Sequence, residues 1–213
     1  MKSKKLIKAE EIFYGISHGI GILISISALV LLVVFSAIRQ ENIKIISFTV
    51  FGATMIAMFI SSTLFHSVKN LRVKSKLNKL DHSTIYLLIA GTYTPVCLVA
   101  IGGNIGWIVF SIIWILALSG IIYKVIFYKG GKQERTISAF VYLGMASIVI
   151  FVIVPLIKNT NGTTLWFLLA GCLSYASGIV FYLIKKIPFG HGIWHLSILG
   201  GSICHFFAFL YLI

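Results

Sequence analysis

The chain has 213 residues, of which 59% are hydrophobic and 11% are charged, and its mean hydropathy is +1.02. A soluble domain has about 25% charged residues, so this composition excludes an ordinary soluble protein and indicates a polytopic membrane protein. The formal net charge of +13 would suggest nucleic-acid binding in a soluble chain. Here the cations lie in short connections between apolar runs, and nucleic acid is not an expected partner.

Seven apolar stretches follow one another along the chain, each long enough to cross a bilayer as a helix of about 20 residues. They cover residues 14–37, 45–67, 81–102, 105–127, 135–156, 164–184 and 191–213. The connections are short, and the longest, VKNLRVKSKLNK, is predicted to be a basic loop. We therefore expect one all-α domain over residues 1–213, a seven-transmembrane-helix bundle. The first apolar run is too long for a cleaved signal peptide, which predicts a retained first helix.

The positive charges are divided unevenly between the two sides of such a bundle. Fifteen of the 18 lysines and arginines lie at the N-terminus or beside the second, fourth and sixth connections; the other three are Arg39, Lys44 and Lys158. Short loops rich in Lys and Arg stay in the cytoplasm. The pattern predicts a cytoplasmic N-terminus and an external C-terminus, and it supports an odd number of spans.

Polar side chains that are costly in a bilayer gather near the cytoplasmic ends of four spans. SSTLFHS closes the second span, LDHSTIY opens the third, HGIWH opens the seventh, and ISHGIG lies early in the first. Segments far apart in the sequence thus bring histidines and one carboxylate to a similar depth. These residues are His18, Ser62, His66, Asp81, His82, His191 and His195.

Three of these histidines are candidate ligands of a metal ion. His191 and His195 are four residues apart, which places both rings on one helix face with Cβ atoms about 5–6 Å apart. His66 would add a third imidazole and complete the His₃ set that zinc uses in catalytic sites. Asp81 is then the candidate to hold or deprotonate a water at the metal. Ser62, one turn before His66, could orient that carboxylate, the water or a substrate carbonyl.

Each of these residues also has a simpler interpretation. The His191–His195 pair could extend to water at the membrane surface. Asp81 could cap the third span, where it is expected in the first turn. The shared depth of three histidines and one aspartate favours a metal site over these separate roles.

The remaining histidines fit the site less well. His82 points about 100° away from Asp81 around the helix, so we expect it to face the loop. His18 has the right depth, but the sequence does not show which way its helical face points. We expect it to be at most an outer contact of the site. His205 lies ten residues beyond His195, about 15 Å along the helix. We expect it in a hydrogen bond across the bundle or along a substrate cavity.

The segment AGTYTP in the third span carries a further structural prediction. Pro95 is expected to kink the helix. Gly91 and Thr92 are expected to allow close helix packing.

The same segments carry a family resemblance. EEIFYGISHGIG, SSTLFHS, LDHSTIYLLIAGTYTP and PFGHGIWHLSILGGSICHF resemble the bacterial hemolysin III family. That family belongs with the progestin and adipoQ receptors and, more distantly, with the alkaline ceramidases. The resemblance implies a seven-helix bundle with zinc (Zn²⁺) near the cytoplasmic face. It also implies His66, His191 and His195 as ligands, Asp81 as the residue that holds the water at the zinc, and Ser62 as a further recurring polar residue.

Three functions of different classes follow from the residues and the resemblance. The first is a zinc-dependent hydrolase of the plasma membrane that acts on a lipid amide or ester, with Asp81 as the base. The second is a non-catalytic sensor or homeostasis factor in which zinc is structural. The third is a pore-forming cytolysin, which we rank as a secondary property because seven apolar spans favour a resident membrane protein. Membrane lipids are the expected partners, and the oligomeric state stays open.

Reporter fusions at the two ends test the predicted orientation. We expect a cytoplasmic signal at the N-terminus and an external signal at the C-terminus, because the cation asymmetry directs insertion. Signals from the same side at both ends would contradict seven spans. A reversed pair of signals would contradict the orientation alone.

Overall fold

The computed structural model describes residues 4–128, 131–184, 187 and 189–213. Every regular element in these ranges is helical, and seven segments within them are long and apolar enough to cross a membrane. The predicted all-α, seven-span fold is confirmed. Backbone groups in hydrocarbon must be paired within their own segment, which is why apolar runs of this length form helices. Among the cations used to predict orientation, Lys2, Lys129, Lys185 and Lys186 lie outside the described residues, and the orientation stays a prediction.

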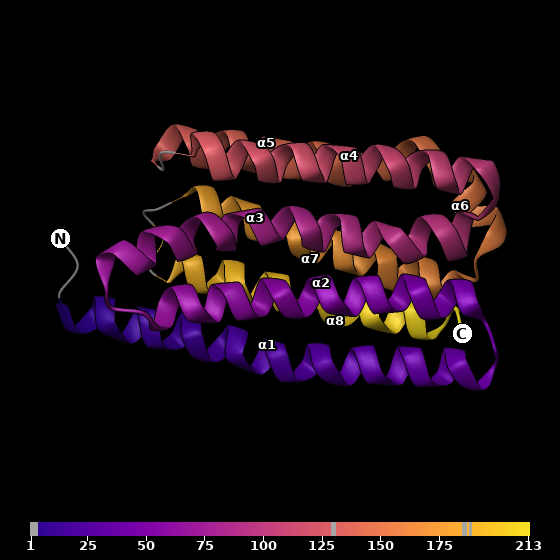
Figure 1. Ribbon diagram of the computed structural model, residues 1–213, viewed down its shortest axis with the longest axis horizontal. Coiled ribbons are helices and arrows are strands. Elements are labelled where there is room, and N and C mark those ends of the chain that lie inside the picture. The colour runs from indigo at the N-terminus through magenta and orange to yellow at the C-terminus, as the bar shows by residue number, and fades with distance from the viewer. Residues whose placement is uncertain (1–3, 129–130, 185–186, 188) are drawn as a thin grey trace.

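Eight α-helices build the seven spans in the described part of the chain (Figure 1). They are α1 (Lys4–Ile38), α2 (Asn42–Ser67), α3 (Leu71–Pro95), α4 (Gly103–Phe127), α5 (Lys132–Ser147), α6 (Ile153–Asn159), α7 (Gly162–Leu183) and α8 (Gly190–Leu210). A π-helical segment, η1 (Val96–Ile101), continues the third span after α3. A 3₁₀ segment, η2 (Ile148–Val152), joins α5 to α6 within the fifth span.

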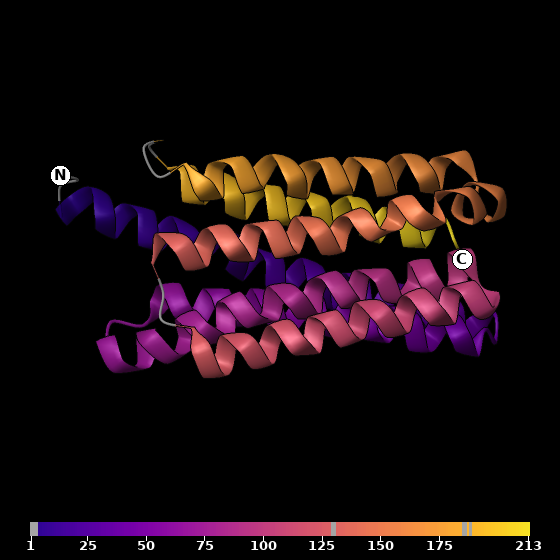
Figure 2. The ribbon, with the colours of Figure 1, turned by 90° about the horizontal axis from the view of Figure 1, so that it is seen from above.

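The helices form one elongated bundle, which Figures 1 and 2 show from two directions. Consecutive helices pack side by side from α1 to α4 and again from α7 to α8, and α8 packs back on α1. The start of α1 and the end of α8 lie at opposite ends of the bundle, as an odd number of spans requires (Figure 1). The end of α2 and the starts of α1, α3 and α8 share one end of the bundle.

Aromatic side chains and small residues hold the helices together. Phe51 of α2 and Phe209 of α8 are fully buried, and their rings meet edge-on at a centroid separation of 4.8 Å. A Cβ at Gly91 of α3 would overlap the side chain of Thr54 of α2, so the close packing predicted at Gly91 is confirmed. Apolar side chains also cover the outside of the bundle. Phe151, for example, is 87% exposed and would face lipid.

The third span begins earlier than the sequence predicts. The loop prediction for VKNLRVKSKLNK is wrong from Leu71 onward, because α3 already starts there. The Asn70 side-chain oxygen caps this helix by accepting hydrogen bonds from the backbone N–H groups of Arg72 and Val73 at 3.0 and 3.3 Å. Hydropathy detects only the apolar part of a helix, whereas Lys and Arg are good helix formers outside the membrane.

Asp81 and His82 consequently lie well inside α3 and not in its first turn. The interpretation of Asp81 as a helix cap is wrong, because the unpaired N–H groups of this helix are beside Asn70. Pro95 is the last residue of α3, and the π-helical η1 follows it. The helix type therefore changes at the position where a kink is predicted.

Candidate metal centre

Three histidines from two helices meet where α2 ends and α8 begins. His66 is next to the last residue of α2, and His191 and His195 lie in the first two turns of α8. One ring nitrogen of each lies within 4.8 Å of the other two. His66 and His195 are buried, and His191 is partly buried. The structure thus brings together the three residues that the sequence proposes as ligands, in a group that can hold a metal ion.

A carboxylate fixes the orientation of the His66 ring. His66 Nδ1 lies 3.2 Å from Glu11 Oε2, and Lys74 Nζ lies 2.7 Å from the same oxygen. Because an ionised carboxylate only accepts, Nδ1 carries the proton in this contact. His66 Nε2 is buried and has no hydrogen-bond partner. The ring therefore keeps a free lone pair, and a carboxylate behind the imidazole is the usual outer contact of a metal-bound histidine.

A hydroxyl has the same role at His195. His195 Nδ1 lies 3.4 Å from Ser17 Oγ, and the Ser17 hydroxyl donates to the Tyr14 carbonyl oxygen at 3.0 Å. The Ser17 oxygen is then left to accept from Nδ1–H. His195 Nε2 keeps its lone pair and lies 3.1 Å from His191 Nε2. Zinc binds imidazole at about 2.0–2.1 Å, so two nitrogens at this separation fit one ion.

Aromatic rings of α1 cover the triad. The Tyr14 ring lies 5.1 Å from the His66 ring, 4.9 Å from His191 and 5.2 Å from His195. One turn later, the His18 ring stacks on His195 at a centroid separation of 3.7 Å. His18 is outside the group of candidate ligands found among the described residues. It is a direct neighbour of one candidate ligand, His195. The sequence alone did not show which neighbour this face of α1 contacts.

A small cavity with both polar and apolar lining residues adjoins the triad. Its volume is about 10 Å³, close to the space that one water molecule needs. His191 and His195 line it from α8, Ser62 from α2 and Asp81 from α3. The Ser62 side chain is a hydrogen-bond partner of the Asp81 carboxylate. Asp81 is outside the group of candidate ligands, so it lies beside the space that an ion would occupy.

The structure decides the positions of the other two histidines. His82 lines the same small cavity, with its ring 5.3 Å from Tyr128 and 6.3 Å from Tyr182. The expectation that His82 faces a loop is wrong. α3 begins well before His82, at Leu71, so this residue lies inside the bundle. His205 Nε2 lies 3.3 Å from the Leu168 carbonyl oxygen of α7, which confirms the hydrogen bond predicted across the bundle.

Apart from His18, the residues behind the candidate ligands were not among those that the sequence singled out. Glu11, Tyr14 and His18 are spaced three and four apart, which places them on one face of α1. Lys74 lies in the part of α3 that is predicted to be a loop. The helical spacing in EEIFYGISH was the available signal, but its value depends on knowing that α1 and α3 extend beyond the apolar runs.

Comparisons with known proteins agree with this architecture. Residues 7–206 match the family model described as Haemolysin-III related. A Bacillus subtilis (strain 168) protein named Hemolysin-3 homolog is 45% identical over 202 residues, which cover 95% of this chain and 93% of the relative. Hemolysin-3 of Bacillus cereus is 42% identical over 202 residues, covering 95% and 91%.

A more distant human relative extends the comparison beyond bacteria. Monocyte to macrophage differentiation factor of Homo sapiens is 31% identical over 169 residues, covering 75% of this chain and 67% of the relative. The family match over nearly the whole chain and these relatives confirm the resemblance read from the sequence. This chain is a multi-pass membrane protein that belongs to the haemolysin-III-related family.

Proposed function

We propose that this protein is a zinc-dependent hydrolase of the plasma membrane that cleaves an amide or ester bond of a membrane lipid. One observation carries the proposal: two of the three imidazoles that can hold a metal, His191 and His195, line one small cavity together with a carboxylate and its hydroxyl partner. Metal-assisted hydrolysis needs both an electrophilic centre and a base. The histidines would supply the electrophilic centre by holding the metal ion, and Asp81 would supply the base.

The donor set supports zinc as the ion. Three imidazoles with one position left open are typical of catalytic zinc sites, and imidazole also suits copper, iron and nickel. Glu11 and Ser17 engage Nδ1 of His66 and His195, which leaves Nε2 of each ring as the ligand atom. Such outer contacts set the ring orientation and raise the basicity of the ligand.

The residues around the cavity support hydrolysis. A zinc ion held here would act as a Lewis acid and lower the pKa of a coordinated water to about 7. Asp81 would accept the proton that the water loses and deliver it to the leaving amine or alcohol. Ser62 would hold the Asp81 carboxylate in position. The water oxygen would bond to the carbonyl carbon, the bond from that carbon to nitrogen or oxygen would break, and the products would be a fatty acid and an amine or alcohol.

A structural metal that holds the bundle together is the second candidate. His66 belongs to α2 and the other two histidines to α8, while Glu11 and Ser17 connect both sets to α1. An ion in this position would hold three helices, as a non-catalytic sensor or homeostasis factor requires. Lysis of other cells, which the name of the Bacillus cereus relative suggests, is a third candidate. Seven apolar spans favour lysis as a secondary effect of a resident membrane protein.

Replacing any histidine of the triad is expected to remove the metal. Elemental analysis of detergent-purified wild-type protein should give about one zinc per chain, and His66→Ala, His191→Ala and His195→Ala should each lose it. His205→Ala is the matched control, because His205 is also on α8 but bonds to the Leu168 carbonyl oxygen. Stoichiometric zinc in any of the first three variants would remove that residue from the ligand set.

Glu11→Gln is expected to weaken zinc binding without removing a ligand. The neutral amide orients the His66 ring less strongly, and loss of such an outer contact typically costs about 10–100-fold in metal affinity. Competition with a zinc chelator measures the change. Lys74→Met is the control, because it removes the other partner of Glu11 and keeps the contact with His66. Equal affinity of Glu11→Gln and wild type would exclude this role for Glu11.

Asp81→Asn is expected to keep zinc and to lose hydrolysis. The amide cannot accept the proton, and loss of a general base typically costs about 10²–10⁴-fold in rate. The measurement is release of free fatty acid from a panel of N-acyl and O-acyl lipids by purified protein. Glu41→Gln changes the carboxylate that directly precedes α2, and α2 begins at the other end of the bundle (Figure 1), so the rate should be unchanged. Activity that survives Asp81→Asn would exclude Asp81 as the base. Zinc without hydrolysis of any lipid by wild type would favour the structural candidate.

A further inference from the structure

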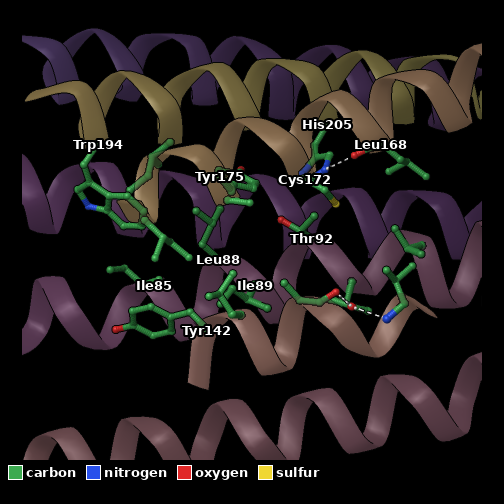
Figure 3. Close-up of a pocket in the computed structure, with 18 of the residues that line it drawn as sticks. Ile85, Leu88, Ile89, Thr92, Tyr142, Leu168, Cys172, Tyr175, Trp194 and His205 are labelled. Atoms are coloured by element: carbon green, nitrogen blue, oxygen red, sulfur yellow. Dashed lines mark hydrogen bonds between the residues drawn. The ribbon is translucent and has the colours of Figure 1, made fainter. Parts of the chain in front are cut away.

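A second, larger cavity lies inside the bundle between α3, α5, α7 and α8 (Figure 3). Its volume is about 130 Å³, comparable with an engineered apolar cavity of about 150 Å³ that binds benzene. Leucine, isoleucine, valine and aromatic side chains form most of its wall. An apolar cavity of this size is suited to part of an apolar ligand.

This large cavity begins where the small cavity beside the histidine triad ends. Ile85, Trp194 and Ile198 line both spaces. In Figure 3, Trp194 and Ile85 lie towards one end of the large cavity, and His205 and Leu168 lie towards the other. The large cavity therefore leads from the metal centre along the bundle towards His205.

Most hydroxyls in the wall of the large cavity already have partners. The Tyr93 hydroxyl donates to backbone carbonyl oxygens of α5, and the Tyr142 hydroxyl donates to the His82 carbonyl oxygen at 2.9 Å. The Tyr175 hydroxyl lies 3.0 Å from Ser202 Oγ. These hydroxyls already have hydrogen-bond partners within the protein and need none from a ligand. The wall around them is therefore effectively apolar.

Two polar atoms in the wall have no partner. Thr92 Oγ1 and His205 Nδ1 are buried, and neither has a hydrogen bond within the described part of the chain. The exposed fractions of the two residues are 8% and 3%. Native proteins rarely leave such groups unpaired. The Thr92 side chain thus lines a cavity, in addition to the helix-packing role predicted for it.

The tautomer of His205 defines what the missing partner must be. Its Nε2 faces the Leu168 carbonyl oxygen, which can only accept, so Nε2 carries the proton and Nδ1 is an acceptor. Gly171 of α7 allows this approach, because a Cβ there would meet the imidazole. The Thr92 hydroxyl can donate or accept. A hydroxyl group on a ligand can do both at once, donating to His205 and accepting from Thr92.

We propose that the large cavity binds an aliphatic chain that carries a hydroxyl group, and that His205 Nδ1 and Thr92 Oγ1 hold this hydroxyl. The chain would run from there past Trp194 to the metal centre. This inference deepens the proposed function and rests on it in identifying the chain as the acyl part of the substrate. A ketone or an ether oxygen lacks the donor that His205 requires. A plain methyl group leaves both atoms unpaired.

The helix geometry sets the length of the chain. His195 and His205 are ten residues apart on α8, or roughly 15 Å along its axis, which is about the length of a fully extended chain of a dozen carbons. Suitable probes are therefore 12-hydroxydodecanoic acid, its 12-methoxy ether and dodecanoic acid. The three compounds share the carboxylate and the chain and differ only at the end that would reach His205.

Competition binding to purified wild-type protein tests the proposal. Radiolabelled 12-hydroxydodecanoic acid is displaced by each unlabelled compound, and the hydroxy acid should bind about tenfold more tightly than the ether or dodecanoic acid, as expected for a paired hydroxyl in a buried site. Thr92→Val keeps the side-chain shape and should abolish this preference, as should His205→Phe. Thr94→Val is the matched control on the same helix. The Thr94 hydroxyl bonds to the Ala90 carbonyl oxygen, so this variant should keep the preference.

The metal-centre variant His66→Ala separates this site from the proposed function. A hydroxyl preference that persists in this variant supports the site at His205, whether or not the protein hydrolyses lipids. A preference that disappears with His66 would place the hydroxyl at the metal centre and overturn the proposal. Equal binding of the three compounds to wild type, or binding of none, would also overturn it. A preference that survives both Thr92→Val and His205→Phe would do the same.

Discussion

Buried imidazole nitrogens are the main constraint on this structure. A polar atom without a partner inside a helical bundle is costly, and His66 and His195 are both buried. Each ring has one nitrogen in contact with a side chain of α1, either Glu11 or Ser17. The remaining nitrogens of the triad share one small region, where a single metal ion would satisfy them together. This requirement links α1, α2 and α8 at this end of the bundle.

The polar end of the bundle is built by helix segments that extend past the apolar runs. α1 supplies Glu11 from such an extension, and Tyr14 and Ser17 from the start of its apolar run, all on one face of the helix. The basic start of α3 supplies Lys74, which bonds to Glu11. A carboxylate so close to the membrane is tolerable because it has both a cation and an imidazole as partners. The extensions thus orient the candidate ligands without themselves reaching the small cavity.

Polarity changes in steps along the interior of the bundle. The small cavity beside the triad has imidazoles, hydroxyls and a carboxylate among its lining residues together with apolar side chains, and the larger cavity that follows is mostly apolar. Two unpaired polar atoms, on Thr92 and His205, appear again inside the larger cavity. This order matches a molecule with a reactive polar head, an aliphatic chain and one distal hydroxyl. An apolar interior alone would select only for chain length, because hydrophobic contact is non-directional.

The sequence by itself determined that this is a polytopic membrane protein, how many spans it has and that His191 and His195 share one helix face. Hydropathy detects membrane helices, and helical periodicity places residues four apart on one face. The start of α3, the direction of His82 and the unpaired hydroxyl of Thr92 were decided only by the tertiary structure. Hydropathy does not detect a charged helix extension, and periodicity within one helix does not show which neighbour it faces. The contact between Ser17 and His195 joins residues 178 positions apart, and only the packing of α1 against α8 brings them together.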